Sequence, residues 1–479
     1  MMSRLRILAW LFLVCQGLPA LDLRPYAGPD APLYATLTQT HQRLVQDLVL
    51  QAYRTHGQRD PRWDDEVEWV LTAAAGSLAK AGTPASEAEG LRRAEALIRP
   101  PLSCSEPLVL WAGFQLARNA GWKIRHPWCD RANRAWEKRR KETQADLAPE
   151  YPAVLQALTL CYMLGTYNNG TSEKAKRVLR ENVPLVAAAW REVWRRQELL
   201  EAPELLMEII NILDPETPEL ADALFAAQTA GMAGGAWPAW GVDGANACLR
   251  VETAWAWRGD GWASTVKEEG WARFRADLDE AAILAERSWQ AKPCARLASA
   301  AISIAGGRGS DEGEQWFLRS ISACFDRPTT WQARAYFLMP RWGGSFDQLL
   351  QHGLDALATE RFDTVVPWEV VQVVSQALKD AKEAPKMEQL RARMHALGYD
   401  QALERCFATY EAQDPSRAGM HAAVRAAMAH RLGRMDEARK WLAKAPPEAC
   451  TSSLAKKWGV KWDDLHALDI PVEGDPSRF

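Results

Sequence analysis

The sequence predicts an all-α protein built from antiparallel helical hairpins. Apolar residues recur at steps of three and four through most of the chain, which is the pattern of helices with one buried face. Glycine and proline clusters interrupt these periodic segments and predict the turns between helices. The alternating β-branched pattern of a half-buried strand is absent from the sequence. We therefore expect packed helices and no sheet.

Length and composition indicate a folded protein of more than one typical core. The chain has 479 residues, so two compact units or one continuous helical array are expected. Apolar residues make up 48% and charged residues 25%, a balance typical of folded soluble proteins. The net charge of -3 provides no overall field that would attract nucleic acid or anionic lipid. We expect no nucleic-acid partner.

The first 20 residues are typical of a secretory signal peptide. Arg4 and Arg6 precede an apolar run from Ile7 to Cys15, and small or helix-breaking residues follow up to Ala20. This pattern predicts export to the periplasm or the extracellular space. Lipidation at Cys15 is the weaker alternative, because the small residue expected before a lipidated cysteine is missing. No later stretch approaches the ~20 apolar residues of a membrane-spanning helix, so no transmembrane segment is expected.

Export would place the remaining cysteines in an oxidising compartment, where an even number suggests disulfides. Eight cysteines follow the signal peptide: Cys104, Cys129, Cys161, Cys248, Cys294, Cys324, Cys406 and Cys450. Cys294 opens one expected helix and Cys324 closes the next, so an antiparallel hairpin would bring them to the same end and allow a disulfide. The same argument supports Cys129 with Cys161 more weakly. No Cys-x-x-Cys occurs, and we expect no structural zinc.

The N-terminal helical region covers residues 21–231. A proline-rich lead gives way at Tyr34 to helical spacing, and a break after Gly82 makes Ser86 a candidate N-cap. Further helices are expected near residues 106–120, 130–145, 151–164, 172–196, 204–213 and 219–230, separated by Gly121, Pro127, Pro149, Asn168 to Gly170, and Pro215. A formal glycosylation sequon begins at Asn169.

Residues 232–365 form the most distinctive region, and its glycine- and tryptophan-rich start at residues 232–241 is a candidate boundary. Thr265 with Glu268 predicts a capping box at the start of a long helix. One apolar stripe then repeats at three- and four-residue steps along that helix: Trp271, Phe274, Leu278, Ala281, Ala285 and Trp289. The next hairpin turns at residues 306–309. Ser345 with Gln348 predicts a second capping box.

The C-terminal helices cover residues 366–446, and residues 447–479 are expected to form a loosely attached tail. Helices are expected near residues 368–382, 386–397, 402–412 and 418–432. Small residues at Ala426, Gly433 and Ala438 have spacings that resemble a tetratricopeptide repeat, in which they let two helices pack closely. The predicted fold class is therefore an all-α protein whose antiparallel hairpins stack as a degenerate TPR-like solenoid.

Two unusual strings resemble a bacterial family catalogued as domain of unknown function 4034. They are Gly261-Trp-Ala-Ser-Thr-Val-Lys-Glu-Glu-Gly-Trp271 and, after a helical hairpin, Pro340-Arg-Trp-Gly-Gly-Ser345. The resemblance covers residues 247–357. It implies a TPR-like helical fold and assigns no reaction.

The tryptophan-rich stretch permits two interpretations. Most of its rings are expected in the core between helices. The other interpretation is an exposed ligand-binding groove, and the residues proposed for it are Trp255, Trp257, Trp262, Arg341 and Trp342. An arginine at the end of a helix can instead bond to the last carbonyl groups.

The sequence offers little support for catalysis, and we predict no catalytic, metal-binding or cofactor-binding residues. Ser264 and Lys267 match Ser-x-x-Lys, but the companion motifs of that enzyme class are missing. Glycoside hydrolysis needs two carboxyl groups facing one pocket, and the acids considered for it are Asp260, Glu268, Glu269 and Asp277. The leading prediction is an exported helical-repeat scaffold that binds a protein or peptide in its concave face. The alternative is a carbohydrate-active or cell-wall enzyme on an α-helical toroid.

Overall fold

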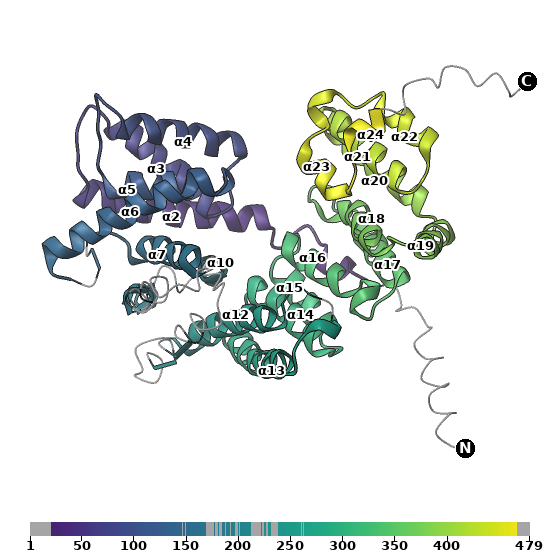
Figure 1. Ribbon diagram of the computed structural model, residues 1–479, viewed down its shortest axis with the longest axis horizontal. Coiled ribbons are helices and arrows are strands. Elements are labelled where there is room, and N and C mark those ends of the chain that lie inside the picture. Colours follow the sequence, from purple (N-terminus) through teal and green to yellow (C-terminus); the bar gives the residue numbers. More distant parts are fainter. Residues whose placement is uncertain are drawn as a thin grey trace, which may run out of the picture. The chain divides into compact units, whose positions relative to one another are not determined.

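The computed structural model confirms the all-α fold of helices packed against their neighbours (Figure 1). It describes residues 21–466 apart from 146, 149, 169–176, 178–180, 182–183, 187, 192, 197–199, 201, 212–221, 223–224, 227–228, 231–237, 260 and 262. All regular elements in this described part are helices. None of the described helices has the length and hydropathy needed to cross a bilayer. The predicted signal peptide and the sequon at Asn169 lie outside the described residues.

The chain divides into two compact units. The larger comprises residues 32–330, and the smaller comprises residues 331–466 together with residues 21–31. The division falls between Thr330 and Trp331, within the residue range 232–365. It cuts α16 (Pro328–Phe337).

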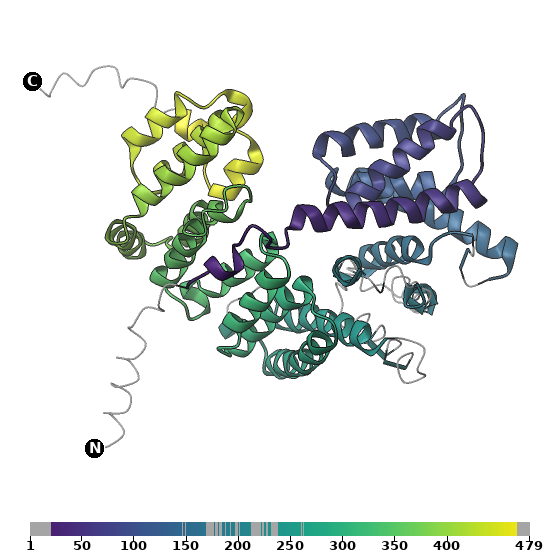
Figure 2. The ribbon, with the colours of Figure 1, turned by 180° about the vertical axis from the view of Figure 1, so that it is seen from behind.

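The larger unit begins with consecutive hairpins. Their helices are α2 (Tyr34–His56), α3 (Asp64–Leu78), α4 (Pro84–Ile98), α5 (Pro107–Leu116), α6 (Trp122–Thr143), α7 (Ala153–Asn168) and α10 (Pro203–Asn211). Helix α2 packs along α3 (Figure 2), and α5 packs on α3, α4 and α6. Thr83 caps α4, with Ser86 as its reciprocal partner, so the predicted cap lies three residues too late. Pro127, expected as a separator, lies inside α6.

The same unit continues with α12 (Ala239–Arg258), α13 (Glu268–Ala291), α14 (Ala295–Arg308) and α15 (Gly313–Ala323). Each packs against the next in sequence. The predicted cap at Thr265 is wrong: Thr265 ends a 3-10 turn, and α13 begins at Glu268 after Lys267. Glu268 and Glu269 instead complement the positive helix start. The ends of the unit meet where the Tyr34 amide donates to Asp326 at 2.6 Å.

The smaller unit carries the C-terminal helices around one apolar core. They are α17 (Phe346–Leu357), α18 (Glu369–Asp380), α19 (Ala384–Ala396), α20 (Tyr399–Gln413), α21 (Ala418–Arg431), α22 (Met435–Leu442), α23 (Ser452–Trp458) and α24 (Trp462–His466). Ser345 caps α17 by accepting from the Gln348 amide, which is the half of the predicted capping box that the structure shows. The predicted TPR-like pair is present as α21 and α22, joined at Gly433 with a φ of 72°.

The predicted tail differs from the structure. Residues 452–466 form α23 and α24, and Trp458 and Leu465 are buried in the core of the smaller unit. Tryptophan and leucine side chains at these positions supply enough apolar surface to hold two short helices in place. Residues 467–479 lie outside the described part.

Candidate peptide-binding groove

Helices α13, α14 and α15 enclose an open groove of about 910 Å³ in the larger unit. Its apolar lining comes from all three helices and comprises Ala282, Ile283, Ala285, Ala301, Ile304 and Trp316. Its polar lining comprises Asp279, Glu286, Arg287, Arg308, Glu312, Gln315 and Arg319. A groove of this size, apolar at its base and charged at its rim, can hold side chains of a peptide.

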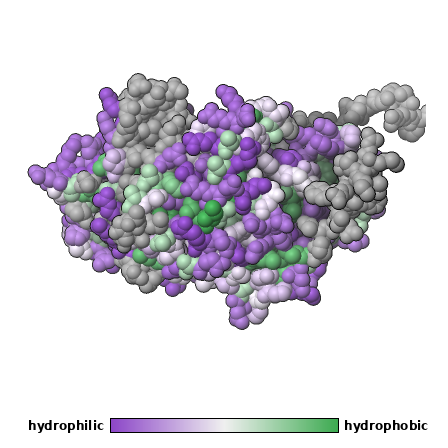
Figure 3. All heavy atoms as spheres, turned by 90° about the horizontal axis from the view of Figure 1, so that it is seen from below, coloured by the Kyte–Doolittle hydropathy of each residue, from purple (hydrophilic) through white to green (hydrophobic). Residues whose placement is uncertain are grey.

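Ile283 is the most exposed large apolar side chain among the described residues, at 61%. The other exposed large apolar residues are scattered, and the face drawn in Figure 3 is mostly hydrophilic with small apolar patches. On α13, Ile283 lies four residues after Asp279 and three before Glu286, so the three share one face of the helix. Ile283 therefore stands between two carboxylates at the groove.

Each of these carboxylates is joined to an arginine from another helix. The Arg308 Nε lies 2.9 Å from Asp279 Oδ1, and the Arg319 Nη1 lies 2.5 Å from Glu286 Oε2. Hydrogen bonding from Arg319 holds the pKa of Glu286 below its ordinary value. These ion pairs link α13 to α14 and to α15 on either side of Ile283, so they fix the width of the groove.

Aromatic rings hold Arg319 in place. Its guanidinium lies 4.4 Å from the centre of the Trp316 ring, and Trp316 meets Trp289 edge to face with centroids 6.0 Å apart. Because the Trp316 ring already fixes the position of the Arg319 guanidinium, this side chain loses less conformational entropy when a partner binds the groove.

One end of the groove is acidic. Glu312 lies 3.4 Å from Arg308, which also binds Asp279, and the exposed Asp311 adjoins Glu312 in the turn between α14 and α15. Two carboxylates thus share one arginine, and Asp311 adds a third negative charge next to Glu312 in the sequence. This excess of negative charge favours a basic side chain in a bound partner.

The described residues that the sequence suggested for a ligand site do not line this groove. Trp255 is half-buried and packs edge to face on Phe274 with centroids 5.1 Å apart, and Trp257 lies under the Arg273 guanidinium. Both belong to α12 and neither lines the groove. Trp262 lies outside the described residues.

Arg341 and Trp342 belong to the smaller unit, in a 3-10 turn (Pro340–Trp342). Arg341 pairs with Asp380 at 3.3 Å, and Trp342 packs beside Tyr336 with ring centroids 5.3 Å apart. These contacts hold the turn against the preceding helix α16 and against the end of α18. The proposed ligand-binding set therefore does not form one site within either unit.

The described acids that were considered for catalysis have different surroundings. Glu268 and Glu269 are exposed in the first turn of α13, and Asp260 lies outside the described residues. Asp277 is buried 3.7 Å from Arg250, and burial raises its pKa. Arg250 also binds Glu280 at 2.8 Å and Asp222 at 2.5 Å, so one arginine neutralises part of this cluster.

The predicted disulfide is not formed. Cys294 and Cys324 are both free and buried, and burial raises the pKa of each thiol. Their helices α14 and α15 do pack together, as the argument required. Cys294 lies beside Glu204 of α10, whose carboxylate accepts hydrogen bonds at the start of α14. Cys129 is also free, and the side chain of Cys161 lies outside the described part.

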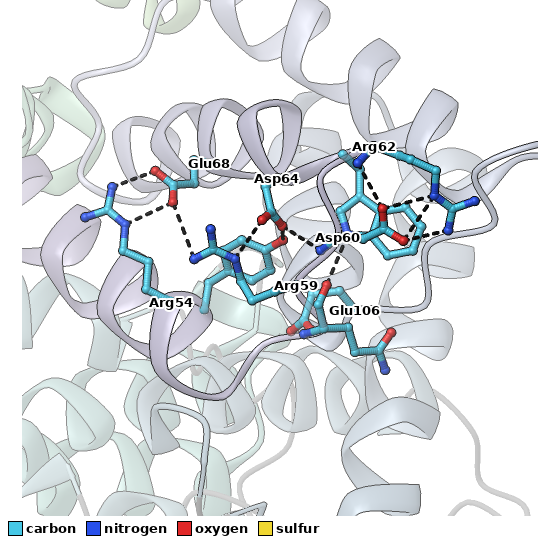
Figure 4. A network of polar contacts seen from close by, with 10 residues as sticks. Arg54, Arg59, Asp60, Arg62, Asp64, Glu68 and Glu106 are labelled. Carbon is cyan, nitrogen blue, oxygen red and sulfur yellow. Dashed lines mark hydrogen bonds and ion pairs between the residues drawn. The ribbon is translucent and has the colours of Figure 1, made fainter.

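A second polar network serves the fold (Figure 4). Asp64 at the start of α3 accepts from the Tyr53 hydroxyl at 2.5 Å and from Arg59 at 2.9 Å. Buried Glu106 accepts from the Gln58 amide at 2.7 Å, and burial raises its pKa. The network ties the loop after α2 to the starts of α3 and α5. The polar groups named here hydrogen-bond to one another, which favours a structural role for the network.

Sequence reasoning missed the groove residues Ile283, Arg308 and Arg319. One signal was available, because Ile283 lies off the buried stripe of its helix, between Ala281 and Ala285. An isoleucine on an otherwise polar face predicts an exposed apolar side chain, which is what the structure shows at Ile283. Comparisons with family models, curated proteins and solved structures found no match for the chain.

Proposed function

We propose that this protein is a binding scaffold that holds a peptide segment in the groove between α13, α14 and α15. The observation that carries the proposal is the exposed Ile283, which lies between two interhelical ion pairs at this groove. The occupant combines an apolar side chain, which covers Ile283, with a basic side chain, which meets the acidic end. We further propose that the scaffold works after export, and that its distinctive strings place it with the family of domain of unknown function 4034.

The energetics support a moderate, specific interaction. Covering an exposed isoleucine contributes about 1–2 kcal/mol, and central apolar contacts often dominate small interfaces. The ion pairs already fix the walls, so little ordering is needed on binding. The acidic end adds selectivity for a basic partner more than affinity.

The electrostatics favour binding over glycoside hydrolysis. A general acid needs a carboxyl group whose pKa is raised. The pKa of Glu286 is lowered by Arg319, and Asp279 is paired with Arg308. These two groove carboxylates thus act as partners of arginines.

Selection from a library of random phage-displayed peptides on the purified chain tests the proposal. Enriched peptides should carry an apolar residue close to lysine or arginine, because both features of the groove would then be satisfied. The Ile283→Asp variant should fail to enrich them, while Val365→Asp, which changes a 54% exposed apolar residue of the smaller unit, should enrich them normally. Enrichment by Ile283→Asp equal to that of the wild type would overturn the proposal.

A further inference from the structure

A second pocket lies in the larger unit, between α4, the loop that follows it, α5 and the start of α6. Its volume is about 560 Å³. Its apolar lining comprises Ile98, Pro100, Leu110, Ile124, Pro127 and Trp128. Ile124 is 44% exposed, whereas Trp128 is buried and forms a firm wall. The pocket therefore presents an apolar surface for a side chain to cover.

The charge at this pocket is positive. Arg99, Lys123 and Arg131 line it, against the single acid Glu95, which pairs with Arg99 at 3.1 Å. Among the described residues, Lys123 and Arg131 have no carboxylate within ion-pair distance, and Arg131 lies 5.4 Å from the Trp128 ring centre. At the α13–α15 groove, by contrast, Arg308 and Arg319 are both paired. Two cations here remain available to an incoming anion.

The start of α6 adds to this positive field. Its first turn contains no acidic residue, and its N-cap is Gly121, which offers no side-chain acceptor. The partial positive charge of a helix N-terminus is therefore uncompensated by side chains at this point. Lys123 and Ile124 lie in this first turn, so the helix start and the pocket coincide.

The Cys104 thiol in the pocket is a poor nucleophile at neutral pH. Cys104 lines the pocket but is buried, and burial raises its pKa to about 11. The thiol therefore stays protonated and is a poor nucleophile. The lining of this pocket therefore favours ligand binding over catalysis by the thiol.

We propose that this pocket binds an acidic peptide segment, with an apolar side chain against Ile124 and Trp128 and carboxylates at Lys123 and Arg131. The apolar, walled lining favours a peptide over nucleic acid or a membrane surface, which are bound through extended basic surfaces. The whole chain, at a net charge of -3, supplies no such surface field. The two hollows of the larger unit thus take partners of opposite charge.

Fluorescence anisotropy on the full chain tests this site, with a short fluorescein-labelled peptide that alternates glutamate and leucine as the probe. The wild type should bind it, and added salt should weaken binding because the contacts are ionic. The double variant Lys123→Glu/Arg131→Glu should bind about tenfold more weakly or worse. Ile124→Ala should also weaken binding, through lost apolar contact alone.

The control is Lys138→Glu, which makes the same kind of charge reversal at one position of the same helix. Lys138 is exposed, lies near Glu142 and does not line the pocket, so its variant should bind like the wild type. Circular dichroism checks that all variants keep their helix content. Ile283→Asp should leave binding of the acidic probe unchanged, which separates this site from the groove.

Equal affinity of the wild type and the double variant would overturn the proposal. So would equal binding of a probe in which glutamine replaces glutamate. Binding of phosphatidylserine vesicles or of a DNA oligonucleotide through Lys123 and Arg131, with no binding of the acidic peptide, would contradict it and assign the pocket to that class of ligand.

Discussion

Glu204 illustrates how a buried charge is accommodated in the larger unit. Its carboxylate accepts from the backbone amides of Ala295 and Arg296 at the start of α14, and it lies 3.1 Å from Arg327. Arg327 is only 1% exposed, and burial lowers its pKa. One side chain from α10 therefore caps another helix and neutralises a buried guanidinium.

Replacing Glu204 by alanine should lower the free energy of unfolding by about 3 kcal/mol or more, because the buried Arg327 would lose the charge of its carboxylate partner and the start of α14 would lose its acceptor. Urea denaturation followed by circular dichroism measures the change. As a control, Asp436→Ala breaks a pair whose carboxylate is fully exposed and should cost less than about 1 kcal/mol. Similar losses in the two variants would contradict the assigned role of Glu204.

Glu369 should make the smaller unit less stable as the pH rises. Its carboxyl is buried, and burial raises its pKa from 4.5 to about 8, although nearby Lys457 opposes the shift. The folded state then binds a proton that the unfolded state has released, so stability falls between pH 4.5 and 8. The full loss is at most about 5 kcal/mol.

Thermal unfolding across this pH range measures the effect. The Glu369→Gln variant should show a flatter dependence on pH, because glutamine carries no ionisable proton. A variant whose dependence on pH matches that of the wild type would rule out Glu369 as its source.

At the scale of single elements, Ser345 is the clearest test of the capping argument. Its hydroxyl accepts from the Gln348 amide at 3.2 Å at the start of α17. Ser345→Ala should therefore lower the free energy of unfolding by about 1 kcal/mol. Ser322→Ala is the matched control, since the exposed Ser322 hydroxyl bonds only to the Arg319 carbonyl of its own helix. Equal effects of the two substitutions on the melting temperature would refute the capping role.

Helices were the most predictable elements. Periodicity alone locates α13 and the α21–α22 pair, because their buried faces are continuous in sequence. The predicted N-cap was confirmed at Ser345 and was wrong at Thr265, since the same residue types also fit a short 3-10 turn. The helices after residue 451 were missed because their stability comes from packing Trp458 into a distant core, which local sequence does not show.

The candidate site was less predictable than the fold. The tryptophan-rich stretch suggested an exposed binding surface, but Trp255 and Trp342 pack against neighbouring aromatic rings. The groove depends instead on pairs such as Glu286 with Arg319, which lie on different helices. Spacing along the sequence cannot reveal such pairs, because they form only when the hairpins stack.

At the scale of the whole molecule, residues 21–31 belong to the smaller unit although 299 residues separate them from Trp331. The Arg361 Nη1 donates to the carbonyl oxygens of Ala27 at 3.1 Å and Gly28 at 2.6 Å. The Leu21 amide donates to Asp355 at 3.2 Å. These hydrogen bonds attach the start of the described chain to its C-terminal unit.

Arg361→Ala should loosen this attachment, because two backbone carbonyls lose their donor. Hydrogen exchange at residues 26–31 should become faster, by about fivefold or more for a loss near 1 kcal/mol. Arg405→Ala, which removes an exposed arginine paired with Glu360, should leave exchange there unchanged. Unaltered exchange in Arg361→Ala would show that other contacts hold the segment.

The most direct test of the scaffold proposal is the affinity of one selected apolar-basic peptide for the wild type, Ile283→Asp and Val365→Asp, measured by isothermal titration. We predict that Ile283→Asp lowers the affinity at least about tenfold. The substitution removes the apolar contact at the groove, and the bound peptide would cover a third carboxylate beside Asp279 and Glu286. Val365→Asp should bind like the wild type. Unchanged affinity in Ile283→Asp would contradict the groove as the binding site.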